Sequence, residues 1–93
     1  MNPKDLQSND DLASYLVWMG KRLGDGRQSA LADDVILASR FASGSPSEFL
    51  HEAQSALEKV VSLRPSPLTN EEIEGAKTVV AQIKVAFKKI GGA

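Results

Sequence analysis

Apolar residues recur at helical spacing near the start of the chain. The stripe consists of Leu12, Tyr15, Leu16, Met19 and Leu23. Positions three or four residues apart share one face of an α-helix, so this spacing predicts a helix. Ser8 or Asn9 is a favourable N-cap in front of it, and Gly24 and Gly26 indicate its end. We therefore expect the first helix over about 9–23.

The second stretch, about 29–42, is apolar in nearly every direction around the expected helix. One stripe contains Leu31, Val35, Ala38 and Ala42. Other apolar residues, Ile36, Leu37 and Phe41, fall outside that stripe. A helix with apolar residues all round is usually central and buried. We expect the same of this one.

Two further helices begin at strong start signals. Ser45-Pro46-Ser47-Glu48 and Thr69-Asn70-Glu71-Glu72 both have the spacing of a capping box, in which the first and fourth side chains bond each other's backbone N–H groups. Pro65 and Pro67 cannot continue a helix and end the third. The predicted ranges are about 46–63 and 70–90.

No stretch alternates apolar and polar residues in the manner of a strand, and no repeat is present. The predicted fold is all-α, a compact bundle of four short helices. A chain of 93 residues is too short to build two cores. We therefore expect a single helical domain over 1–93, with flexible ends at 1–7 and 91–93.

Charge and cysteine content narrow the classes of function. The chain has 11 basic and 12 acidic residues, a net charge of −1, and no cysteine. Near-neutral charge argues against a nucleic-acid coat or a polybasic membrane binder, and disulfide or thiolate chemistry is excluded. The first residues lack the basic and apolar regions of a signal peptide, and no stretch is long enough to span a bilayer. We expect a cytoplasmic protein without a membrane partner.

The triplet Trp18-Met19-Gly20 matches the Trp-x-Gly motif of a family of small secreted helical hairpins. That family carries the motif at the bend between two long helices. Here the triplet lies inside the first expected helix, and Pro46, Pro65 and Pro67 interrupt any long second helix. A three-residue match without its structural context does not assign the chain to that family.

Trp18 projects away from the apolar stripe of the first helix, and two interpretations follow. In the first, it packs at the rim of the core, as large aromatic residues usually do. In the second, Trp18, Arg22 and Val17 form an anchor for a protein partner, because Trp and Arg are enriched among interface hot spots. Arg22 is four residues further on, within reach of a cation–π contact with the indole. Ala13 and Gly20 on one edge of the helix predict a close helix crossing.

The sequence offers little for catalysis or metal binding. Glu48 and His51 form an E-x-x-H pair, as in di-iron helical bundles, but a complete site needs a second pair and His51 is the only histidine. Both residues also fall on the polar face of their expected helix. We predict no catalytic residue, no metal, no cofactor and no small-molecule substrate.

Nucleic-acid binding is an alternative with two possible sources. Residues 37–57 resemble a helix-turn-helix segment, although the second helix would present Glu48 and Glu52 to phosphates. Lys84, Lys88 and Lys89 make the end of the last helix basic. Lysines at that position also complement the helix dipole, which is an ordinary structural role.

The function we expect is protein–protein interaction or regulation without enzymatic activity, through an apolar helical surface. The chain would act as a homodimer or bound to a larger partner. The expected contact residues are Trp18, Arg22, Val17 and Val85, the last because it lies among polar neighbours on the last helix.

Overall fold

The computed structural model describes residues 8–89, which form four α-helices and one short 3₁₀ helix. The elements are α1 (Asn9–Asp25), α2 (Ser29–Ser39), η2 (Arg40–Ser43), α3 (Pro46–Ser62) and α4 (Asn70–Lys89). The all-α prediction is confirmed. The flexible ends expected at 1–7 and 91–93, and residue 90 of the last predicted helix, lie outside the described residues.

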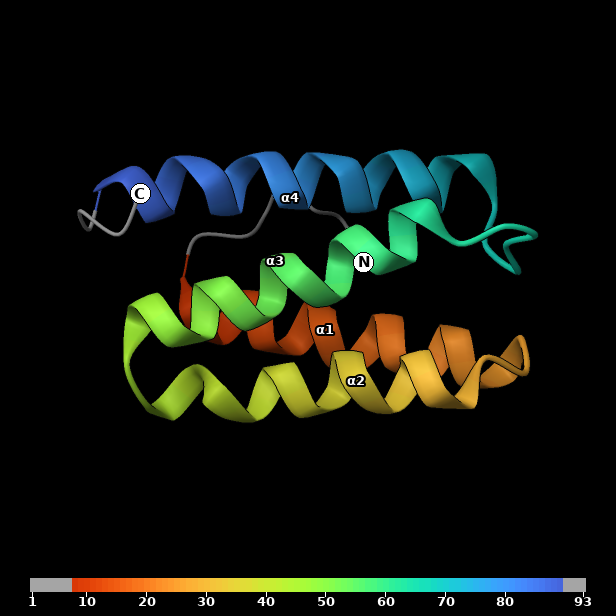
Figure 1. Ribbon diagram of the computed structural model, residues 1–93, viewed down its shortest axis with the longest axis horizontal. Coiled ribbons are helices and arrows are strands. Elements are labelled where there is room, and N and C mark those ends of the chain that lie inside the picture. Colours follow the sequence, from red (N-terminus) through yellow and green to blue (C-terminus); the bar gives the residue numbers. More distant parts are fainter. Residues whose placement is uncertain (1–7, 90–93) are drawn as a thin grey trace.

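Consecutive helices run in opposite directions along the long axis of the molecule (Figure 1). The helix α1 packs most extensively against α2, α3 packs against α4, and α2 also contacts α3. Between α1 and α4 the backbones stay further apart. Side chains from both helices line the space between them.

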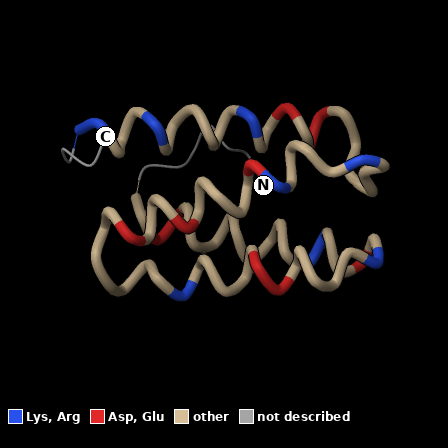
Figure 2. Tube along the Cα trace, viewed as in Figure 1, with Lys and Arg blue, Asp and Glu red and all other residues tan. Residues whose placement is uncertain are grey.

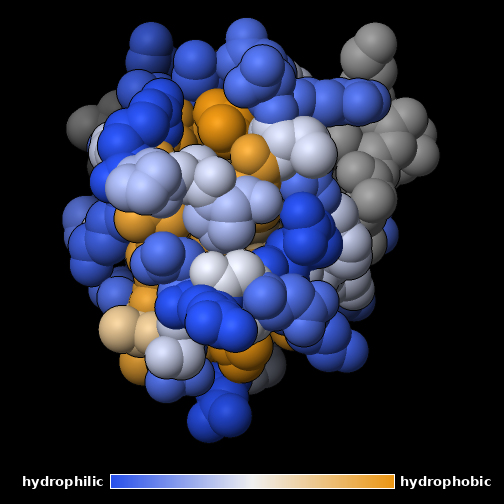
Figure 3. Space-filling view, turned by 90° about the vertical axis from the view of Figure 1, so that its right-hand side faces the viewer, coloured by the Kyte–Doolittle hydropathy of each residue, from blue (hydrophilic) through white to orange (hydrophobic). Residues whose placement is uncertain are grey.

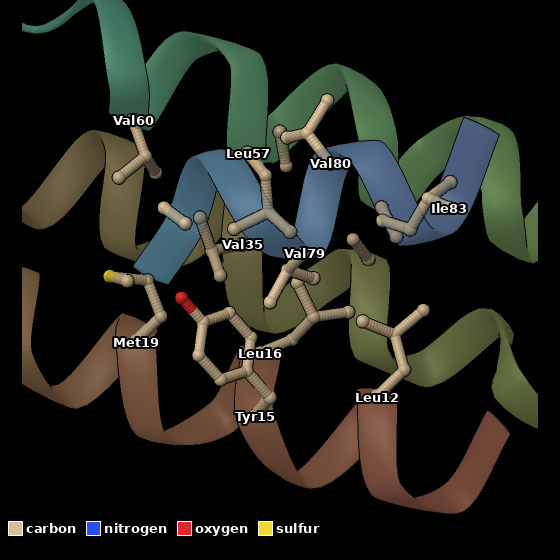
Figure 4. Packing of buried hydrophobic residues seen from close by; sticks show 14 of the residues in the cluster. Leu12, Tyr15, Leu16, Met19, Val35, Leu57, Val60, Val79, Val80 and Ile83 are labelled. Carbon is tan, nitrogen blue, oxygen red and sulfur yellow. The ribbon is translucent and has the colours of Figure 1, made fainter. Parts of the chain in front are cut away.

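The core is formed by one stripe from each helix (Figure 4). Buried polar or charged residues are absent from the described part of the chain. The stripe predicted for the first helix is buried in full. The largest fully buried side chains are Tyr15, Phe49, Leu16, Met19, Leu23, Leu57, Val35, Val60 and Val79.

The capping predictions are confirmed at two helix starts and wrong at a third. The Ser8 hydroxyl accepts a hydrogen bond from the backbone N–H of Asp11 at 3.1 Å. At the start of α4, Thr69 and Glu72 accept from each other's backbone N–H groups at 3.1 and 2.9 Å, which completes the capping box. At the start of α3, Ser45 makes no such bond and its hydroxyl lies 3.1 Å from that of Ser47.

Two glycines allow close approach of neighbouring elements. A Cβ atom at Gly20 would collide with the side chain of Ile36 on α2, so the predicted close helix crossing is present there. A Cβ atom at Gly26 would collide with Pro67, which brings the loop before α4 against the end of α1. Although Gly24 and Gly26 predicted the end of α1, the residue with a left-handed backbone is Arg27, at φ 65°.

The expectation that the second helix is buried at the centre is wrong. The helix α2 buries only Ala32, Val35 and Ala38, and it ends at Ser39 before the 3₁₀ turn. Leu37 is 53% exposed. The physical reason is that α2 packs on α1 and α3 while α4 lies beyond α3, so α2 is an outer helix (Figure 1).

Candidate functional site

A partly open groove of about 550 Å³ lies between the start of α1 and the second half of α4. Its floor includes Leu50 near the beginning of α3, which is buried between the two walls. The lining residues are Ser8, Asn9, Leu12, Leu50, Thr78, Val79, Ala81, Gln82, Ile83, Val85, Ala86 and Lys89. The groove exists because α1 and α4 are held apart by the side chains that pack between them.

The interior and the rim of the groove differ in chemistry. Its interior is aliphatic, whereas the rim carries hydroxyl and amide groups and the Lys89 ammonium. Val85 stands at the outer edge and is 55% exposed, the more exposed of the two large apolar residues on the described surface. An apolar groove with an exposed valine at its edge is suited to an apolar side chain from another molecule.

At the opposite end of the molecule the described residues form a more polar surface (Figure 3). There the α1–α2 and α3–α4 loops face the viewer, and hydrophobic atoms show only in small separate patches among polar ones (Figure 3). Apolar exposure on the described residues therefore concentrates on two helices, at Val85 of α4 and Leu37 of α2.

Trp18 and Val17 are both half-buried on α1. Trp18 packs against the core, and its ring lies 5.7 Å from that of Tyr15 with a tilt of 37°. The rim-of-core interpretation therefore describes its position, although part of the side chain remains accessible. Val17 lies on the other flank of α1, so α1 does not bring these two residues together as one patch.

Arg22 is held by an intramolecular ion pair. Its Nε atom donates a hydrogen bond to Oε2 of Glu72 and its Nη2 atom donates one to Oε1, both at 2.8 Å. These two bonds join α1 to the start of α4. The Arg22 hydrogen bonds hold the pKa of the Glu72 carboxyl well below its ordinary value, at about 2. This carboxylate also accepts from Thr69, so one side chain both caps α4 and ties it to α1. The predicted partner anchor at Arg22 is thus occupied inside the chain.

Tyr15 is an unusual core residue because its hydroxyl has no hydrogen-bond partner. The ring is 1% exposed and its oxygen points into the packed interior near Met19 (Figure 4). Burial raises the pKa of this phenol, and the nearby negative charge of Glu72 raises it further. The group therefore stays protonated at neutral pH.

The residues of the nucleic-acid alternative are exposed but divided. Lys84, Lys88 and Lys89 are exposed on the last turns of α4. The helix-turn-helix-like segment has a 3₁₀ turn where a compact motif would have a tight turn, and its second helix begins at Pro46 with the exposed Glu48 in its first turn. The segment belongs to α2, η2 and α3 and the lysines to α4, although Leu50 of the segment and Lys89 line the same groove.

No group of three or more His, Cys, Asp or Glu side chains within residues 8–89 could hold a metal ion. Glu48 and His51 are both exposed on α3, on the polar face where the sequence indicated them. None of the described helices combines the length and apolar character that crossing a bilayer requires.

Comparison of the chain with protein-family models, with curated proteins and with solved structures gives no match. The groove and its charged surroundings are therefore the basis for a functional interpretation.

Proposed function

We propose that this chain is a non-enzymatic protein–protein interaction module that binds through the α4 wall of the groove, with Val85 at the exposed outer edge of that wall. The observation that carries the proposal is the 55% exposure of Val85 beside an aliphatic groove of about 550 Å³. Covering such a side chain gains roughly 25 cal/mol for each Å² of apolar surface removed from water. The proposal keeps the cytoplasmic location expected from the sequence.

Of the four contact residues expected from the sequence, Val85 has the strongest support. Arg22 already has two hydrogen bonds to Glu72, and breaking them to reach a partner would leave that carboxylate without its cation. Trp18 packs on the core, and Val17 lies on the far flank of α1. We assign Arg22 and Trp18 to the packing of α1 on the rest of the chain, with Trp18 also as a secondary partner contact. Among the described residues, Val17 has no contact that supports a role at the site.

Nucleic-acid binding remains the second candidate, resting on the exposed Lys84, Lys88 and Lys89. Its support is weaker because the net charge is −1 and α4 begins with acidic residues. It predicts affinity for duplex DNA that falls steeply with salt. Absence of binding at low salt would eliminate it.

Site-specific photo-cross-linking tests the proposed surface. A benzophenone amino acid is placed at Val85 or, as a matched control, at Leu37, which has nearly the same exposure on a different helix. The proposal predicts a discrete covalent adduct between the chain and its protein partner when the cross-linker is at position 85, and no adduct when it is at position 37. Adducts from position 37 alone, or from neither position, would contradict it.

A further inference from the structure

The outward face of α4 carries a seam of five exposed residues. Glu74, Thr78, Ala81, Val85 and Lys88 are spaced four, three, four and three residues apart. All five are exposed, whereas the opposite face of α4 is buried against the bundle. Alternation of three and four is the spacing by which one helix packs along another. This seam therefore has the geometry of a helix-pairing surface.

The size of the side chains favours another helix as the occupant. The central residues Thr78 and Ala81 are small, so a neighbouring backbone can approach closely, and Val85 supplies apolar contact area. Between Glu74 and Lys88 the seam is about 20 Å long at 1.5 Å per residue. It is a short surface, of the kind that supports weak, reversible association.

The distribution of charge along α4 indicates which helix would pair with it. The start of α4 is acidic and its end is basic, as Figure 2 shows by colour. Glu74 forms an exposed ion pair with Lys77 of the same helix at 3.1 Å. A helix laid antiparallel on α4 would complement the charges at the two ends of the seam with a basic residue opposite Glu74 and an acidic residue opposite Lys88. The face of α4 itself has both, and a two-fold axis at Ala81 brings them together, since Glu74 and Lys88 each lie seven residues from that position.

We propose that the chain forms an antiparallel homodimer in which α4 packs on α4 of a second copy, with Ala81 at the two-fold axis and Glu74 paired with Lys88 of the second copy. This inference rests on the proposed function and names the partner of that surface. In the same register the aliphatic part of Lys77 lies over Val85 of the second copy. A parallel arrangement would instead place Glu74 against Glu74, and it is disfavoured by like-charge repulsion.

Charge exchange on the seam tests this register. Glu74→Lys places lysine opposite lysine, and Lys88→Glu places glutamate opposite glutamate, twice in each dimer. Each single variant should weaken dimerisation roughly tenfold to a hundredfold, as measured by sedimentation equilibrium over a wide protein concentration range. The double variant should restore the wild-type affinity, because the two charges have only changed places.

Mixing the two single variants gives a sharper result. Glu74→Lys and Lys88→Glu should each be mostly monomeric at concentrations at which the wild type dimerises, but their equimolar mixture should form a heterodimer, because each basic seam then meets an acidic one. The controls Asp33→Lys and Lys21→Glu change the net charge equally at exposed positions of α2 and α1 and should leave dimerisation unchanged. Circular dichroism verifies that every variant is folded.

The outcomes separate this inference from the proposed function. A wild-type chain that stays monomeric at millimolar concentration, or a mixture that does not associate, overturns the homodimer. A cross-linked adduct from position 85 with a different protein would overturn the homodimer while leaving the proposed binding surface intact. An adduct of twice the chain mass of 10.0 kDa, together with rescue in the mixture, supports both.

Discussion

Substitution of Gly20 by alanine tests the close packing of α1 on α2. An added Cβ would collide with Cγ1 of Ile36, lie 2.8 Å from its Cδ1 and approach the Ala32 carbonyl oxygen to 3.3 Å. Overpacking of this kind costs about 1–3 kcal/mol. Replacing a helical glycine by alanine contributes up to about 1 kcal/mol in the opposite direction. We expect Gly20→Ala to lower the free energy of unfolding by about 1 kcal/mol.

The chain provides a matched control in the same helix. A Cβ atom at Gly24 would have no neighbour within 4 Å, so Gly24→Ala should keep the helix-propensity gain without the collision. The difference between the two variants is then the packing term alone, about 1–3 kcal/mol, or at least about 4 °C in Tm for a domain of this size. Urea and thermal unfolding monitored by circular dichroism measure it.

Ile36→Ala shows whether the collision is the cause. This change removes both Ile36 atoms that the new Cβ would meet and leaves only the 3.3 Å contact with the Ala32 carbonyl oxygen, so Gly20→Ala in that background should lose most of its packing cost. Equal shifts for Gly20→Ala and Gly24→Ala in the wild-type background would refute the reasoning. A cost of Gly20→Ala that persists after Ile36 is truncated would also refute it, because the coupling energy between positions 20 and 36 would then be zero.

Three further predictions concern single side chains. The pKa of Glu72 is lowered from its ordinary value near 4.5 to about 2, so its stabilising contribution is present above pH 4.5 and is lost as the pH falls toward 2. Glu72→Gln should lower the free energy of unfolding by about 1 kcal/mol at neutral pH. The free energy of unfolding of this variant should also fall less between pH 4.5 and about 2 than that of the wild type, as measured by urea titrations at several pH values. Tyr15→Phe removes a buried hydroxyl without a partner, so it should be neutral or stabilise by up to about 1 kcal/mol in thermal unfolding; a loss of that size would reveal an unseen partner. Leu37→Ser should change the free energy of unfolding by less than about 0.5 kcal/mol, and a large loss would show that α2 is buried by something else.

Local signals in the sequence predicted the helices well. Ser8 and the pair Thr69 and Glu72 cap their helices as expected, because these bonds involve residues only three apart. Gly20 likewise indicated a close helix crossing, and the side chain that it faces is Ile36 of α2. The start of α3 shows the limit of such signals. Ser45 has the right spacing, but its hydroxyl lies beside Ser47 instead of capping the backbone.

Features that depend on tertiary arrangement could not be predicted. The pairing of Arg22 with Glu72 joins residues 50 positions apart, and no local pattern selects this glutamate over its acidic neighbours. The exposure of Leu37 follows from α2 being an outer helix, which its composition alone does not determine. For the candidate site, Val85 was recognisable as an apolar residue on a polar face, but the groove beside it required the separation of α1 from α4.

The most direct test of the central claim is to map where the chain is contacted in solution. Amide chemical shifts of the ¹⁵N-labelled wild-type protein are recorded from low micromolar to millimolar concentration. A homodimer formed through α4 should give concentration-dependent shifts confined to the seam and adjoining groove, centred on Ala81 and Val85. Shifts centred on Leu37 of α2, or none up to millimolar concentration, would contradict it.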